Sequence, residues 1–129
     1  MPETKRVLIV DDAAHVVRSL GFVLEKAGYE VLEARDGEQA LDTVRNEFPD
    51  LIFLDIMLPR IDGCEVCRQI KASSELSSIP VVMLTAKSRQ EERQTALEAG
   101  ANEYITKPFS PGGVVEMANS LLGEKAEDG

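Results

Sequence analysis

Five residues in the middle of the chain, Leu51–Asp55, constrain the fold more than any others. They are four large apolar residues followed by a carboxylate, with a proline close to each end of the run. A short, wholly apolar run of this kind is typical of a strand buried on both faces of a sheet. Because an ionised carboxylate is costly to bury, we expect Asp55 at the carboxyl end of that strand. A second run, Val7–Val10, leads in the same way into Asp11 and Asp12.

Strand-like and helix-like patterns alternate five times along the chain. The predicted strands are Arg6–Val10, Tyr29–Ala34, Leu51–Leu54, Val81–Leu84 and Asn102–Thr106. The predicted helices are Ala14–Lys26, a helix with Ala40, Leu41 and Val44 on its inner face, Gly63–Ala72, Arg89–Ala99 with Ala96, Leu97 and Ala99 inward, and a helix capped by Ser110 that ends before Gly123. This alternation predicts an α/β fold with a parallel sheet and helices on both faces.

The composition of the strands predicts their order in the sheet. The first, third and fourth strands are wholly apolar and belong in the middle, whereas the mixed second and fifth fit the edges. Right-handed crossovers then favour the order 2-1-3-4-5, the flavodoxin-like doubly wound (βα)5 arrangement.

Polar residues end four of the five predicted strands. Asp11 and Asp12 end the first, Asp55 the third, Thr85 the fourth and Lys107 the fifth. Because the carboxyl ends of parallel strands meet at one edge of a sheet, these five side chains are expected to converge there.

Three carboxylates in one place repel one another, and a cation would relieve that repulsion. Oxygen ligands that leave positions for water suit Mg²⁺. A metal beside Lys107 and Thr85 suits a phosphoryl group, with Asp55 as the nucleophile because it stands alone, and Asp11 and Asp12 as the metal pair. The alternative is that Asp11 and Asp12 only cap the first helix.

The 129 residues predict a single domain, residues 1–129, with a core of about 5–122 and a polar tail or linker start at 123–129. A net charge of −9 argues against direct, phosphate-driven binding of nucleic acid and fits cations or basic partners. No apolar run approaches the ~20 residues of a membrane helix. Residues 1–6 also lack a signal-peptide core, so we expect a cytoplasmic protein that binds no membrane.

Cys64 and Cys67 form the one C-x-x-C motif. Such a motif beside a βαβ pattern can be a redox pair. The alternative is core packing, since Cys67 shares a helical face with Gly63 and Ile70, and nearby carboxylates would oppose formation of a thiolate.

Over about Lys5–Leu122 the sequence resembles the receiver domain of bacterial two-component response regulators. The motifs that carry the resemblance are Val10–Asp12, Leu54–Pro59 with Asp62–Gly63, Leu84–Ala86, Gly100–Tyr104 and Lys107–Phe109. The resemblance implies a phosphorelay switch, in which Asp55 accepts a phosphoryl group from a phosphohistidine on a sensor histidine kinase or a histidine phosphotransfer protein. A downstream effector domain or protein would read the result.

The resemblance also implies roles for the individual site residues. Mg²⁺ would be bound directly by Asp12, Asp55 and the backbone carbonyl of Met57, and through water by Asp11. Thr85 and Lys107 would bind the phosphoryl oxygens. The Lys107–Pro108 bond would be cis, and Tyr104 would turn inward when Thr85 moves.

The signal is expected to leave through the fourth helix, the fifth strand and the fifth helix. The first half of the fourth helix, residues 89–94, is wholly polar, so it should be weakly held and easily shifted. Arg89, Arg93 and Glu103 would flank Tyr104 on the surface that a partner meets. Lys87 is expected at the rim of the phosphoryl pocket, or else as a solvated loop lysine.

Two other functions remain open at this level. One is a metal-dependent aspartyl phosphohydrolase, although enzymes that resemble the haloacid dehalogenases carry a second Asp where this chain has Met57. The other is a receiver-like module that binds partners without phosphorylation. We expect no enzyme beyond self-phosphorylation and self-dephosphorylation, and either a stand-alone receiver or one cut from a longer chain.

Overall fold

The computed structural model describes residues 4–86 and 90–123. Strands and helices alternate as predicted, in the order β1 Arg6–Val10, α1 Ala14–Lys26, β2 Glu30–Ala34, α2 Gly37–Glu47, β3 Leu51–Asp55, α3 Gly63–Ala72, β4 Val81–Ala86, α4 Gln90–Glu98, β5 Glu103–Lys107 and α5 Pro111–Leu122. Within these described ranges, no helix is both long and apolar enough to cross a membrane.

The five strands form one parallel sheet in the order β2-β1-β3-β4-β5, which confirms the flavodoxin-like prediction. Every residue of β3 is buried, and so are four of the five residues of β1, whereas β2 and β5 at the edges are partly exposed. The wholly apolar strands therefore occupy the positions that helices cover on both faces.

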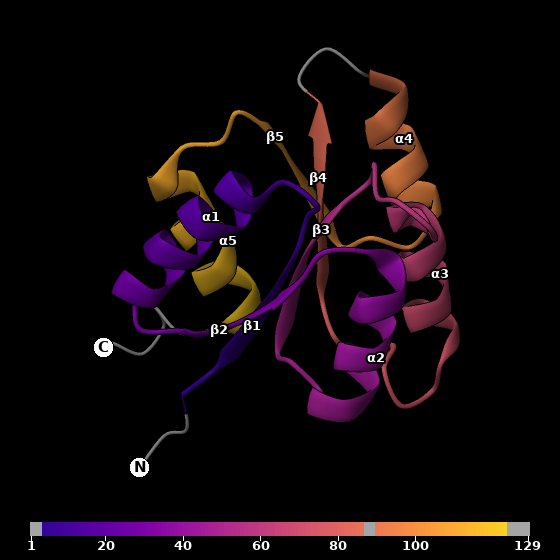
Figure 1. Cartoon of the computed structure of the whole chain (residues 1–129), viewed down its shortest axis with the longest axis horizontal. Helices are drawn as coiled ribbons and strands as arrows, with labels where there is room; N and C mark the ends of the chain where they lie inside the picture. Colours follow the sequence, from indigo (N-terminus) through magenta and orange to yellow (C-terminus); the bar gives the residue numbers. More distant parts are fainter. Residues whose placement is uncertain (1–3, 87–89, 124–129) are drawn as a thin grey trace.

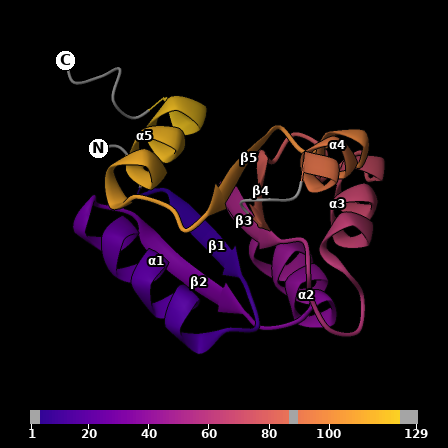
Figure 2. The ribbon, with the colours of Figure 1, turned by 90° about the horizontal axis from the view of Figure 1, so that it is seen from above.

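The helices lie in two layers, one on each face of the sheet (Figure 1). α1 and α5 cover one face and contact each other, while α2, α3 and α4 cover the opposite face (Figure 2). Two apolar cores result. Val7, Ile9 and Phe53 belong to the core under α1 and α5, and their strand neighbours Leu8 and Ile52 to the core under the other three helices.

The strand ends differ from the prediction by one or two residues. β4 extends through Thr85 and Ala86 because these residues still pair with β5, at Thr106 and Lys107. Lys107 is therefore the last residue of β5 rather than the first after it. Tyr29, predicted to begin β2, instead precedes it; its ring is buried and its hydroxyl donates to Asn119 of α5.

The inner face of α4 is narrower than predicted. Ala96 and Ala99 are buried, but Leu97 is 49% exposed, so its assignment to the core was wrong. One turn of a helix places residues three apart on the same side. The core therefore takes Ala96 and Ala99, the partly buried Arg93 lies one turn earlier on that side, and Leu97 faces outward. Arg89, predicted to begin this helix, lies outside the described residues.

The start of α3 packs directly against the end of β3. Asp62 caps the helix by accepting a hydrogen bond from the Glu65 backbone N–H at 3.0 Å. A Cβ on Gly63 would overlap the Asp55 carbonyl oxygen and lie 2.8 Å from the Ile56 Cα atom. Only glycine fits between the strand that carries Asp55 and the helix that follows.

We predict that Gly63→Ala lowers the free energy of unfolding by about 1–3 kcal/mol, because the added methyl group forces backbone atoms apart. Gly112→Ala is the matched control: nothing lies within 4 Å of a Cβ there, and alanine is favoured over glycine in a helix by up to about 1 kcal/mol. Urea denaturation followed by far-UV circular dichroism measures both. Equal stability of Gly63→Ala and the wild type would contradict this packing.

Candidate functional site

Three carboxylates meet at the carboxyl edge of the sheet. Asp11 and Asp12 follow β1, Asp55 ends the adjacent β3, and one oxygen from each lies within 4.8 Å of the others. Asp11 and Asp55 are buried, at 1% and 6% exposure, while Asp12 is exposed. The predicted convergence of these carboxylates is confirmed.

Asp11 is held in place by two hydrogen bonds. Its Oδ1 accepts from the Ala13 backbone N–H at 2.9 Å, and its Oδ2 accepts from Lys107 Nζ at 3.0 Å. Ala13 occupies the N-cap of α1, and no side chain caps that helix. Helix capping therefore does not explain why Asp11 and Asp12 stand here.

Asp55 is under electrostatic strain. Burial raises its pKa from 3.8 to about 6, and the negative charge of Asp11 adds to the shift. Lys107 Nζ, 3.5 Å from Asp55 Oδ2, and the Met57 backbone N–H, 3.2 Å from Asp55 Oδ1, oppose the shift without cancelling it. Without a bound metal ion, the Asp55 carboxyl group in the folded protein therefore keeps its proton up to a higher pH than it would in water.

Lys107 reaches this cluster from the end of β5. Burial works against its charge, but the hydrogen bond to Asp11 and the charge of Asp55 outweigh that effect, and the pKa of Lys107 is raised. Its ammonium group bridges two of the three carboxylates. The peptide bond to Pro108 is cis, as expected.

Thr85 and Tyr104 lie on the neighbouring strands β4 and β5. Thr85 is 1% exposed, and its hydroxyl donates to the Ile105 carbonyl at 3.5 Å. Tyr104, on β5, is partly buried and packs against the core under α2, α3 and α4. The Arg93 guanidinium of α4 lies 5.4 Å from the centre of the Tyr104 ring, so the predicted proximity of these two residues is confirmed.

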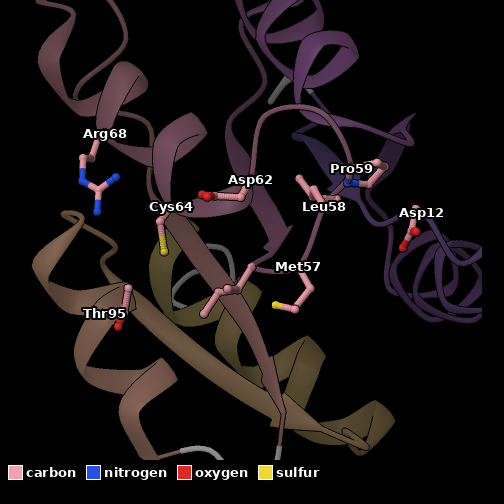
Figure 3. A pocket seen from close by; sticks show the side chains of 9 residues that line it. Asp12, Met57, Leu58, Pro59, Asp62, Cys64, Arg68 and Thr95 are labelled. Atoms are coloured by element: carbon pink, nitrogen blue, oxygen red, sulfur yellow. The ribbon is translucent and has the colours of Figure 1, made fainter.

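Met57 lies on the loop that leaves β3. Its side chain is 66% exposed, and it lines a groove that runs from Asp12 past the loop to Cys64 and Thr95 (Figure 3). The loop backbone therefore borders the carboxylate cluster. The side chain at this position is a thioether, not the carboxylic acid that a phosphohydrolase of the haloacid dehalogenase type would need.

The C-x-x-C motif is part of the core. Cys64 and Cys67 are both buried on α3 as thiols, and burial raises the pKa of Cys67 to about 11. A thiol that ionises so weakly is a poor nucleophile. This supports the packing alternative over the redox alternative.

Sequence reasoning missed one feature of the site, the attachment of the loop after β3 to the start of α2. Arg60 has a positive φ of 70° and forms ion pairs with Asp36 and Glu38. Nothing in the sequence indicated the partner of Arg60. Lys87, the residue expected at the pocket rim, lies outside the described residues.

Comparison with known proteins identifies the class to which this fold and site belong. The family model described as the response regulator receiver domain matches residues 7–119. The chain therefore belongs to the response regulator receiver domain family.

Particular relatives agree with that class. The chain is 45% identical over 118 residues to the alkaline phosphatase synthesis transcriptional regulatory protein PhoP of Bacillus subtilis (strain 168), covering 92% of this chain and 48% of that protein. The chain thus spans about half the length of the curated relatives it matches.

Solved structures also superpose closely on this one. The signal receiver domain of a signal transduction histidine kinase from Syntrophus aciditrophicus matches with a TM-score of 0.88 and 33% identity, covering 94% of this chain and 92% of that one. The chemotaxis response regulator CheY4 of Vibrio cholerae matches with a TM-score of 0.87 and 30% identity, covering 93% and 100%.

We predict that Asp55→Asn stabilises the metal-free protein. Because the folded-state pKa of Asp55 lies above 3.8, the folded state binds the proton more tightly than the unfolded chain. The wild type therefore loses stability as the pH rises from 3.8 to about 6. Asp55→Asn lacks this carboxyl group and does not lose that stability. Above that pH range, the variant should be more stable than the wild type by about 1–3 kcal/mol.

Urea denaturation in EDTA across this pH range measures the difference. The exposed Asp42→Asn on α2 removes the same charge away from the site and controls for the overall reduction in negative charge. An Asp55→Asn variant less stable than the wild type above about pH 6 would contradict the electrostatic account.

Proposed function

We propose that this domain is a phosphorylation switch in which Asp55 accepts a phosphoryl group from a phosphohistidine. The donor would be a sensor histidine kinase or a histidine phosphotransfer protein. One observation carries the proposal: a buried carboxylate at the end of the central strand lies beside two further carboxylates and within 3.5 Å of a lysine ammonium. Membership of the receiver family supports it.

The proposed transfer needs no reactant other than Asp55 and the phosphohistidine. A carboxylate oxygen of Asp55 attacks phosphorus, an O–P bond forms, and the N–P bond of the phosphohistidine breaks with its electron pair left on the imidazole. Lys107 is placed to offset charge on the phosphoryl oxygens, and the Thr85 hydroxyl can donate to one of them by giving up its bond to the Ile105 carbonyl. Hydrolysis of the acyl phosphate by water resets the domain.

The donor set at the site fits Mg²⁺. Its ligand atoms are all oxygens, two of the three carboxylates are buried, and one ammonium group offsets only part of their charge. Asp12 and Asp55, with the Met57 backbone carbonyl, would hold the ion directly, and Asp11 through water. When bound, Mg²⁺ supplies positive charge to the phosphoryl oxygens.

Phosphorylation would be read at the surface formed by α4, β5 and α5. Thr85 is the second-last residue of β4, and Tyr104 lies on the neighbouring β5 with Arg93 at its ring. A shift of Thr85 toward a phosphoryl group would favour an inward Tyr104 and a moved α4, two arrangements of one chain rather than a new fold. A downstream effector domain or protein would bind that surface.

We propose one receiver domain with its core at about residues 5–122. The curated relatives include transcriptional regulatory proteins about twice as long as this chain. The output of the whole protein, and any effector domain attached to it, would depend on sequence outside the receiver.

Incubation with acetyl phosphate and Mg²⁺ should add one phosphoryl group to the wild type, and peptide mapping should place it on Asp55. Asp55→Asn should take up none, because the amide is a far weaker nucleophile than the carboxylate. Asp50→Asn, which changes an aspartate at the opposite end of the same strand, should be modified like the wild type.

Uptake at the wild-type rate and level by Asp55→Asn would contradict the proposal. Sustained release of phosphate from aryl phosphate substrates, with many turnovers per protein, would instead favour the phosphohydrolase alternative.

Asp12→Asn is predicted to weaken Mg²⁺ binding by about tenfold or more, since the loss of supporting groups around a metal alone costs that much. Isothermal titration calorimetry suits this protein, which has no tryptophan to report binding. Asp42→Asn should bind Mg²⁺ like the wild type. Equal affinities of Asp12→Asn and the wild type would exclude Asp12 as a ligand.

If the signal leaves through α4, β5 and α5, amide hydrogen exchange should change when the phosphate mimic beryllofluoride binds with Mg²⁺. Exchange should change in 86–98 and 103–107, because α4 has a narrow inner face and is weakly held. The same segments should not respond in Asp55→Asn. A bound mimic without any change in these segments would show that the signal leaves by another face.

A further inference from the structure

The loop that joins β3 to α3, residues 56–62, carries Met57, which lines one groove with Asp12 (Figure 3) and whose backbone N–H donates to Asp55 Oδ1 at 3.2 Å. Backbone hydrogen bonds to its first residue, Ile56, close the base of the loop. The Gly63 backbone N–H donates to the Ile56 carbonyl at 2.9 Å, and the Leu58 N–H donates to the same oxygen at 3.2 Å. The base of the loop is therefore held by backbone hydrogen bonds that most substitutions would leave intact.

The tip of the loop rests on the start of α2. A Cβ on Gly37, the first residue of that helix, would overlap the Ile61 carbonyl oxygen and lie 2.8 Å from the Ile61 Cβ. Next to Ile61, Arg60 has a φ of 70°, in the left-handed region that long side chains rarely adopt. A contact outside the loop must offset the cost of that conformation.

The Arg60 side chain supplies such a contact. Its Nη1 lies 3.3 Å from Glu38 Oε1 and its Nε lies 3.9 Å from Asp36 Oδ2. Both carboxylates belong to the start of α2, where Asp36 also caps the helix by accepting from the Gln39 N–H at 2.8 Å. The helix thus fixes the Asp36 carboxylate, whereas the Arg60 and Glu38 side chains are both exposed, at 64% and 65%.

We propose that Arg60 is a positioning residue, which holds the loop tip on α2 and so keeps the Met57 carbonyl at the edge of the metal site. The proposal rests on the proposed function, because it concerns the same site. Without Arg60 the tip keeps the packing of Ile61 against Gly37 but loses its ion pairs with α2, and the loop occupies its binding-competent arrangement for a smaller fraction of the time. The apparent affinity for Mg²⁺ falls by that fraction.

Calorimetric titration of the full chain with Mg²⁺ tests this. Arg60→Ala should bind about two- to fivefold more weakly, the effect expected of one exposed ion pair, and high salt should reduce the difference. Arg60→Lys, which keeps the charge, should recover most of the affinity. In a Glu38→Gln background the further loss from Arg60→Ala should be smaller, since the two residues act through one contact.

Arg45→Ala is the matched control. Arg45 is an exposed arginine in the last turn of α2, so the variant loses the same charge at the opposite end of that helix and should bind Mg²⁺ like the wild type. A loss equal to that of Arg60→Ala would reduce the effect to overall charge and overturn the proposal.

Amide hydrogen exchange of the metal-free protein gives a second readout, which does not depend on metal binding. Exchange in residues 57–61 should be faster in Arg60→Ala than in the wild type, while β3 is unchanged. If Arg60→Ala binds Mg²⁺ with wild-type affinity and its loop exchanges at the wild-type rate, the positioning role of Arg60 is overturned. The proposed phosphorylation of Asp55 would be unaffected by that result. A wild type that binds no Mg²⁺ at all would overturn the proposed metal site and the role of Arg60 with it.

Discussion

The burial of the Asp55 carboxylate beside the negative charge of Asp11 is the constraint on which the site depends. Three carboxylates face one ammonium group, so two negative charges are in excess where β1 and β3 end. The sheet holds them there because both strands are anchored by apolar residues in two cores. The repulsion cannot relax by movement of the strands, and it is relieved instead by a proton, a metal ion or a change of ligand. In the function that we propose, a phosphoryl group on Asp55 would change that balance and so allow the site to switch.

The parts around the cluster differ in how firmly they are held, and this difference decides where a change in charge can have effects. Asp11 is fixed by Ala13 and Lys107, and α3 begins against β3 with no room for a side chain. α4 is held mainly by small residues on a narrow face. In the function that we propose, a local change at Asp55 would leave Asp11 and the start of α3 in place and would move α4, which costs least to move. The link between Thr85 on β4 and Tyr104 on β5 lies between the two parts.

Most of the fold could be predicted from the sequence because buried positions are occupied by apolar residues at regular spacings. The apolar runs of β1, β3 and β4 predicted both the sheet and its order, and the residues at their ends predicted where the carboxylates meet. Contacts between side chains distant in sequence produce no such regular pattern. Nothing in the chain indicated that Arg60 would adopt a left-handed backbone and reach α2, or that Leu97 would turn outward while Ala96 and Ala99 turned inward. Those outcomes depend on how neighbouring elements pack, which pattern alone does not specify.

The most direct test of this account is to measure the pKa of Asp55. Asp55 carboxyl carbons labelled with ¹³C can be followed by NMR through a pH titration in EDTA and again with Mg²⁺. Burial beside Asp11 predicts a pKa of about 6 in the metal-free protein, and a marked fall when Mg²⁺ takes the place of the proton. A pKa at the ordinary value near 3.8 in EDTA, with no response to Mg²⁺, would contradict the claim that burial of Asp55 beside Asp11 governs the site.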